Sequence, residues 1–418
     1  MAKLARIRLA GTIAATTLCV AAATEAAAQT PPTGGAIVLN EQLQLGDVFA
    51  GQTLNVVDAQ DQVTATTSAA GNSASGAVQN DAITVRSDQS MQGDAVATTD
   101  LTLGGDTAGP VTATTQAGGN YLAVSAYDAG LTVDATQINE GGLVSATTRL
   151  GEDGARLLGG GYVAASAISN TVAAYGEGSA IDGTVDQANA ATVRAYGRVE
   201  SQYVPAELAV DAEAMANAVA INSGQTSGQS VILQQRSTGA FIEAEASANA
   251  GNAWDLAGRA RASGNRAQLY NQGGSVVAEA NQDNAAYVRA AATTTAYDFG
   301  RAEAQARGAG NELSVGNNDV FVEIDSTQIN TGGVNVTAAF SGTNGYDAYV
   351  GAEAVGNSVT GYACSECEGR LDATSSQVNH GDVSATAQTT VAGSGRAVIS
   401  GANAVGNAAS FHVTRPSH

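Results

Sequence analysis

The side chains that recur most regularly in this sequence are amides, which can hydrogen-bond to one another in stacked ladders. One Asn returns every 46 to 50 positions, and a Gln follows it by 17 to 20 positions. Two marks that keep one phase over seven copies identify a repeat protein. We expect the ladder positions to be Asn72, Asn120, Asn170, Asn217, Asn265, Asn311, Asn357 and Asn407, with Gln137, Gln187, Gln282, Gln328 and Gln377.

Tyrosine offers a second kind of chemistry, because an aromatic ring can stack on a sugar ring. Tyr175, Tyr270 and Tyr362 each lie five residues after the Asn of their repeat. Residues at equal offsets fall in one column when repeats stack, so these three form a candidate glycan-facing column. The alternative is that Tyr simply suits β-strands.

The two cysteines of the distal repeats form a Cys-Ser-Glu-Cys motif at Cys364 and Cys367. The interval from Asn357 to Gln377 is 20 residues, against 17 in five of the other six repeats. In an oxidising compartment this pattern predicts a small inserted loop closed by its own disulfide. A redox role is less favoured, since no βαβ pattern surrounds the motif.

Residue types that would support catalysis or metal binding are scarce. Histidine occurs only at His380, His412 and His418, and there is no Cys/His cluster with the spacing of zinc ligands. Acids such as Asp298 and Asp325 are scattered, and neither a Gly-x-Ser-x-Gly elbow nor a calcium-binding nonapeptide occurs. The sequence therefore predicts a protein that is not an enzyme and needs no metal or cofactor.

The amides must be carried by strands, because apolar residues alternate with a period of two. The pattern Gln-x-Asn-x-x-x-Val-x-(Ala/Val)-x-Ala holds in most copies, whereas the copy at Gln89 is degenerate and that at Gln235 is shifted by one residue. About four strands per repeat fit either a parallel β-solenoid or a seven-bladed β-propeller. Aromatic residues make up only 5% of the chain, which favours the thin solenoid over bulky blades.

The expected solenoid is right-handed and has two coils of about 24 residues in each of about seven repeats. That makes roughly fourteen coils and a length of about 70 Å at the usual strand spacing. We expect the array to fill residues 61–410, after an N-terminal cap over 29–60 and before a tail over 411–418.

The first 28 residues have the features of a secretory signal peptide, with a basic start, a short apolar core and Ala26-Ala27-Ala28 at the cleavage site. Their removal leaves 15 basic and 38 acidic residues, a net charge of 15 − 38 = −23, and no lysine. Such a charge argues against nucleic acid as a partner, because phosphates would be repelled.

An exported, lysine-free array of Gln-x-Asn and Gly-Asn motifs on small alternating residues is similar in kind to curlin repeats. Across the whole chain it most resembles the holdfast anchor protein D family of stalked α-proteobacteria. The resemblance implies a place at the outer membrane and cell surface, an adhesive extracellular polysaccharide as ligand, and other outer-membrane anchor proteins as partners. It supplies no catalytic residues to transfer.

Three functions compete at this point. The first is a structural anchor that joins the outer membrane to an adhesive polysaccharide, the holdfast. The second is a carbohydrate-active β-helix enzyme, which would need an acid/base pair that the sequence does not show. The third is a homo-oligomer or self-assembling fibre subunit, for which in-phase amides and exposed coil ends would act as templates.

Overall fold

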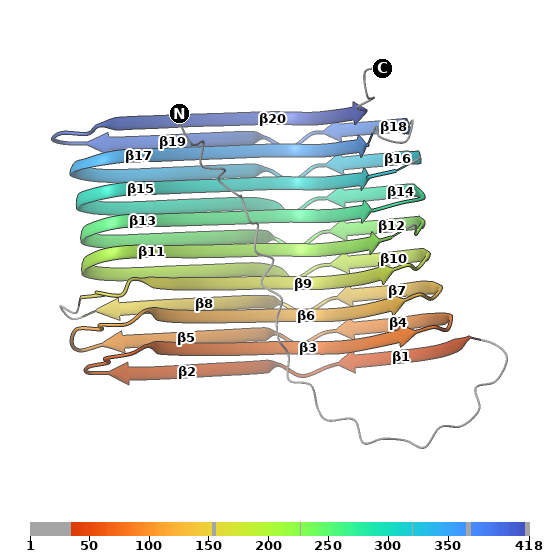
Figure 1. The fold of residues 1–418 in the computed structure, drawn as a ribbon, viewed down its shortest axis with the longest axis horizontal. Helices are drawn as coiled ribbons and strands as arrows, with labels where there is room; N and C mark the ends of the chain where they lie inside the picture. The colour runs from red at the N-terminus through yellow and green to blue at the C-terminus, as the bar shows by residue number, and fades with distance from the viewer. Residues whose placement is uncertain (1–34, 153–155, 226, 320, 365–368, 414–418) are drawn as a thin grey trace, which may run out of the picture. The chain divides into compact units, whose positions relative to one another are not determined.

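The computed structural model describes residues 35–152, 156–225, 227–319, 321–364 and 369–413, and these residues are all-β. The chain winds as a solenoid in which each turn contributes three stretches of strand, which we call the first, second and third faces (Figure 1). Within the described residues, no helix is long and apolar enough to span a membrane.

The first face is a parallel sheet of eight strands with one strand from each turn. These strands are 9 or 10 residues long, and the third-to-last residue of each is a Gln. In order, they are β1 (Ala36–Gln44), β4 (Ile83–Met91), β7 (Leu131–Asn139), β10 (Ile181–Asn189), β12 (Gln229–Ser237), β14 (Ser275–Asn284), β16 (Phe321–Asn330) and β18 (Arg370–Asn379).

The second and third faces belong to one twelve-stranded sheet. In four central turns a single bent strand supplies both faces: β11 (Thr192–Gly224), β13 (Phe241–Asn271), β15 (Tyr287–Asn317) and β17 (Val334–Ala363). In the other turns the second face is β2 (Val48–Val56), β5 (Ala95–Leu103), β8 (Leu143–Glu152) and β19 (Val383–Val391). The third face is then β3 (Val63–Gln79), β6 (Val111–Tyr127), β9 (Gly161–Glu177) and β20 (Ala397–Val413).

The strand register shows that one repeat makes one complete turn. Gln137 pairs with Gln89 on one side and with Gln187 on the other, so neighbouring strands carry equivalent residues of consecutive repeats. The first face therefore counts eight turns. The expectation of two coils per repeat, about fourteen coils and about 70 Å is wrong. Seven steps of ~4.8 Å span roughly 34 Å.

The solenoid prediction itself is confirmed, and a closed propeller ring is excluded by the continuous parallel ladders from β1 to β18. In Figure 1 the near strands run left to right and the faded, distant strands run right to left while the chain climbs from β1 to β20. That path is a right-handed coil, as expected.

Two apolar clusters fill the interior, and both use the third face. The first half of that face packs against the second face around residues such as Val193, Ala195 and Val210. Its second half packs against the first face around residues such as Ile221 and Leu233. Most buried positions are Ala or Val, so the facing strands lie close together and a 48-residue turn needs few bulky side chains.

Candidate binding surfaces and the amide ladders

The Asn residues form one continuous column along the third face, which is buried from Asn72 to Asn357. Each side-chain Nδ2 from Asn72 to Asn357 donates to the Oδ1 of the Asn in the next turn, at 2.8 Å in every step. The second N–H of each amide donates to a main-chain carbonyl of the first face in that next turn, as Asn217 does to the oxygen of Arg236 at 2.8 Å. Each Asn thus ties its own turn to the one that follows.

The Gln residues form a second column along the first face, with the opposite polarity. Each Nε2 donates to the Oε1 of the Gln in the preceding turn, at 2.7 to 2.9 Å. Its other N–H donates to the main-chain carbonyl that follows the Asn of the same turn, as Gln187 does to the oxygen of Ala218. Gln89 and Gln235 belong to this column despite their irregular repeats, and Gln42 starts it.

A third row of amides explains why Gly so often precedes the ladder Asn. A Cβ built on Gly310 would lie 2.4 Å from Oδ1 of Asn330, the Asn of the Gln-x-Asn motif in the next turn. Alanine occurs at this position only as Ala216, where the facing residue is the smaller Ser237. Glycine therefore leaves room for the amide packed above it, whereas Ser169 at the same position donates its hydroxyl to Oδ1 of Asn189 at 2.6 Å.

Gly310→Ala should destabilise the protein by about 1–3 kcal/mol, the usual cost of overpacking a core. Asn330→Ser removes the obstructing amide and recreates the Ala216–Ser237 combination. The two substitutions should consequently cost less together than their separate costs added, by about 1–2 kcal/mol. Urea unfolding of the two single variants and the double variant measures this coupling. Strictly additive costs would contradict the packing explanation.

The three candidate tyrosines share one column on the outer side of the third face. Asn222 lies between Tyr175 and Tyr270, and Gly316 lies between Tyr270 and Tyr362. The three residues are 38 to 47% exposed, and they recur on alternate turns. They form a row of separated aromatic rings along the stack.

Buried carboxylates that the sequence pattern did not reveal lie on the outer side of the central turns. Glu243, Glu303 and Glu312 have side chains only 7 to 11% exposed. Each is paired with two arginines from its own or an adjacent strand: Arg194 and Arg289, Arg259 and Arg301, and Arg261 and Arg307, respectively. Because these six guanidinium groups face internal carboxylates, they offer little attraction to an anionic polymer.

Two tyrosines beside these charges are held in their neutral form. Burial, reinforced by Asp211, raises the pKa of Tyr162 to about 12. Burial and a 2.6 Å hydrogen bond to Glu243 likewise raise the pKa of Tyr196 to about 12. Both hydroxyls therefore act as hydrogen-bond donors at any physiological pH.

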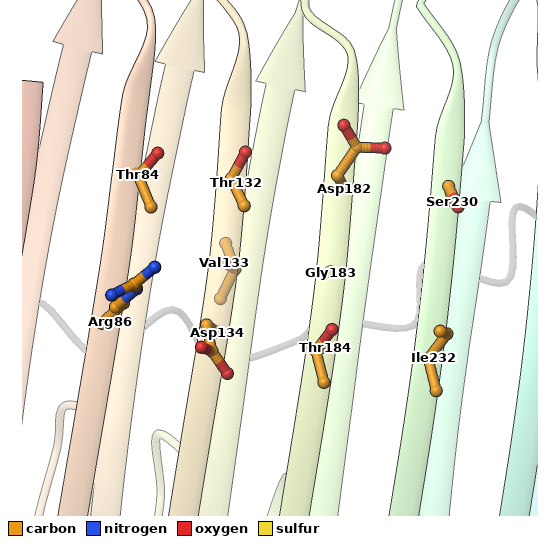
Figure 2. Close-up of a pocket in the computed structure, with 10 residues that line it drawn as sticks. All are labelled: Thr84, Arg86, Thr132, Val133, Asp134, Asp182, Gly183, Thr184, Ser230 and Ile232. Carbon is orange, nitrogen blue, oxygen red and sulfur yellow. The ribbon is translucent and has the colours of Figure 1, made fainter. Parts of the chain in front are cut away.

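The first face carries a shallow hollow of about 230 Å³ on its outer side. Figure 2 shows two rows of side chains that cross β4, β7, β10 and β12. One row holds Thr84, Thr132, Asp182 and Ser230, and the other holds Arg86, Asp134, Thr184 and Ile232. The hollow offers mainly hydroxyl and carboxylate groups, and it is too open to enclose a small substrate.

The remaining predicted sites are placed only in part. Cys364 is half-buried and directly follows β17, and its N–H donates to the carbonyl of Asn317. Cys367 lies outside the described residues, so the Cys364–Cys367 disulfide stays a prediction. Among the residues that the structure describes, no group of three or more His, Cys, Asp or Glu could hold a metal ion.

Comparison with known proteins identifies the family. A family model described as holdfast attachment protein D matches residues 57–333, which are 277 of the 418 residues. The match runs from the end of β2 to just beyond β16, so it includes most turns of the solenoid. No curated protein and no solved structure matches the chain. This chain belongs to the holdfast attachment protein D family.

Proposed function

We propose that this protein is a non-enzymatic anchor that joins the outer membrane to the holdfast polysaccharide. Membership of the holdfast attachment family supports a role in attachment. The two amide columns are the main structural support for this proposal, because their hydrogen bonds join each turn to the next through the buried interior. Pulling two turns apart would break these bonds together with the main-chain ladders of three faces.

The repeated outer surface suits a polymeric ligand. A group that recurs once per turn, or on alternate turns like the Tyr175–Tyr270–Tyr362 column, can contact successive units of one polysaccharide chain. Weak single contacts then add through a high effective concentration. We propose that the described outer faces provide such contacts, with the tyrosine column as one of them.

The route to the cell surface is also part of the proposal. We propose that residues 1–28 direct export and are removed, and that the segment 29–60 ends the array on one side. That segment contributes β1 and β2, and among the described residues these two strands pair through their main chains with β4 and β5 only. A second outer-membrane anchor protein could add a strand to this edge.

Deleting the gene should leave the adhesive polysaccharide synthesised but poorly retained. Because the proposed anchor only holds the polymer, most of it should pass into the medium with its chain length and acetylation unchanged. Lectin staining of cells and of culture supernatant, with chemical analysis of the shed polymer, measures both points. The enzyme hypothesis gives the opposite result: polymer held as firmly as by the parent strain but chemically altered. That result would refute the anchor proposal.

A second candidate function, the self-assembling subunit, is favoured by how well the two ends of the stack match. The strands of the first turn have 9, 9 and 17 residues, and those of the last turn have 10, 9 and 17. Gln42 precedes Asn72 by 30 residues, as Gln377 precedes Asn407. We propose that the strands of the last turn of one copy can pair with the strands of the first turn of another copy.

The polarity of the amide columns fits the same arrangement. At the first turn the outward-facing groups are the amide N–H of Gln42 and the carbonyl of Asn72, because their other groups already bond to the second turn. At the last turn they are the carbonyl of Gln377 and the N–H of Asn407. Donor therefore meets acceptor in both columns when copies stack head to tail, and like groups meet when copies stack head to head.

A further inference from the structure

The bend between the second and third faces carries an exposed aromatic shelf that no sequence pattern had indicated. Trp254 of β13, Gly300 of β15 and Tyr346 of β17 occupy one column, as the pairing of the residues beside them shows. Trp254 is 57% and Tyr346 51% exposed. Their ring centroids are 6.0 Å apart at an interplanar angle of 67°, although a whole turn separates their strands.

The intervening glycine makes this contact possible. A Cβ on Gly300 would lie 2.5 Å from the main-chain oxygen of Trp254 and 3.0 Å from its ring. The bare backbone of β15 therefore lets the indole lie across it and reach Tyr346. Beneath the bend, Phe299 and Phe340 pack edge to face with centroids 4.9 Å apart, which fixes the position of the strand that bears Gly300.

Polar groups border the shelf on two sides. The guanidinium of Arg396 lies 5.5 Å from the ring centroid of Tyr346 and is held by Asp347, to which its Nε donates at 2.9 Å. Two columns away along the strands, Asn252, Asp298 and Asn344 form an exposed row linked by hydrogen bonds of 3.3 and 3.4 Å. The bend thus combines two large aromatic surfaces with amide and carboxylate groups in solvent.

We propose that the shelf formed by Trp254 and Tyr346 binds an uncharged polysaccharide chain. The inference rests on the anchor function proposed above and names the site and ligand class. The C–H face of a pyranose ring is apolar and packs on an indole or phenol, while its hydroxyl groups need donors and acceptors such as the neighbouring amides. A polyanion fits poorly, because the chain without its first 28 residues carries 38 acidic and 15 basic side chains.

Trp254 is the single tryptophan of the sequence, so its fluorescence reports on the shelf alone. Polysaccharide purified from the parent strain should shift the emission in a saturable way, and cellohexaose should do so more than oligogalacturonate. Tyr346→Ala, which keeps the fluorophore, should raise the half-saturating concentration about 30-fold, the effect of losing an aromatic anchor. Tyr287→Ala removes a similar ring, packed edge to face on Phe241, elsewhere on the stack and should change it little. Circular dichroism verifies that both variants are folded.

Co-sedimentation of the protein with the same polysaccharide separates the possible outcomes. If the protein co-sediments but its emission is constant and Tyr346→Ala binds like the parent, the shelf is not the site and the anchor proposal stands. If the parent protein neither co-sediments nor responds, both proposals fail. An emission shift that follows protein concentration without polysaccharide would show that a second copy occupies the shelf, and this too overturns the inference.

Discussion

Asn217→Asp should destabilise the stack severely, with a loss of about 4 kcal/mol or more. Asp has the shape of Asn but no N–H, so the carboxylate would face the oxygens of Arg236 and Asn265, which now accept hydrogen bonds from Asn217 at 2.8 Å. The site is fully buried. Each unsatisfied buried group costs about 1–3 kcal/mol, and an uncompensated buried charge costs about 3–5 kcal/mol.

The loss should grow as the pH rises. Burial and the two facing oxygens favour the protonated acid, so the pKa of the new Asp is higher in the folded state than its value of ~3.9 in the unfolded chain. Below a pH of ~3.9 the new Asp is protonated in both the folded and the unfolded state, and its O–H can donate one of the two hydrogen bonds that Asn217 makes. Above that pH the unfolded state loses its proton first, so stability falls until the folded-state pKa is passed.

Asn407→Asp is the matched control, because Asn407 occupies the same column in the last turn but is exposed. Its Oδ1 accepts a hydrogen bond from Asn357 at 2.8 Å, which a carboxylate oxygen can also accept. Because Asn407 lies in the last turn, its N–H groups have no following turn to bond, and the variant should keep nearly the parental stability. Thermal unfolding followed by circular dichroism at several pH values compares the two. Equal losses at both positions, or a loss at Asn217 that is independent of pH, would contradict the proposed role of the ladder.

The same Asn407→Asp substitution should abolish head-to-tail assembly. In the proposed contact the N–H of Asn407 meets the carbonyl of Asn72 in the next copy, and a carboxylate there would be buried against an acceptor. Truncating such a buried polar pair costs about 2–5 kcal/mol, so the concentration for half-assembly should rise about 30-fold or more. Lowering the pH should restore assembly by protonating the carboxylate.

Sedimentation velocity and electron microscopy of the parent, Asn407→Asp and Gln305→Glu test this expectation. Gln305→Glu places the same extra charge on an exposed lateral position in the middle of the stack. It should assemble like the parent if only the end is involved. A parent protein that stays monomeric at high concentration, or an Asn407→Asp variant that assembles normally, would eliminate the fibre hypothesis.

The sequence was sufficient to predict strands, a solenoid and most residues of the two amide columns, because hydrophobic alternation and fixed spacing follow directly from stacked turns. Gln42, Gln89 and Gln235 were not among the expected ladder positions. It could not decide how many turns one repeat makes. Alternation reports the local strand and not the path between strands, and the abundance of Ala and Val suggested a narrow coil. In the structure the long third face packs against both other faces and so divides the interior into two thin apolar clusters. Small residues can fill each cluster even though the whole turn is wide.

The charge network and the aromatic shelf were missed for a related reason. Glu243 and Arg289 are 46 residues apart, and Trp254 and Tyr346 are 92 apart, so neither pair stands out along the chain. Both spacings become meaningful only once one repeat is known to equal one turn. Searching for complementary residues at one or two repeat lengths would have found them.

The opposite polarity of the Asn and Gln columns has an electrostatic consequence for length. Aligned amides in a single column would add their dipoles turn after turn, as peptide units do along an α-helix. Here every Asn amide points its N–H toward the last turn and every Gln amide points its N–H toward the first. The two columns largely cancel, and parallel sheets add little net dipole of their own. The short Asn284–Asn330–Asn379 row, whose N–H groups also point toward the last turn, is left uncompensated. Turns that carry only the two main columns can therefore be gained or lost with little change in the axial field.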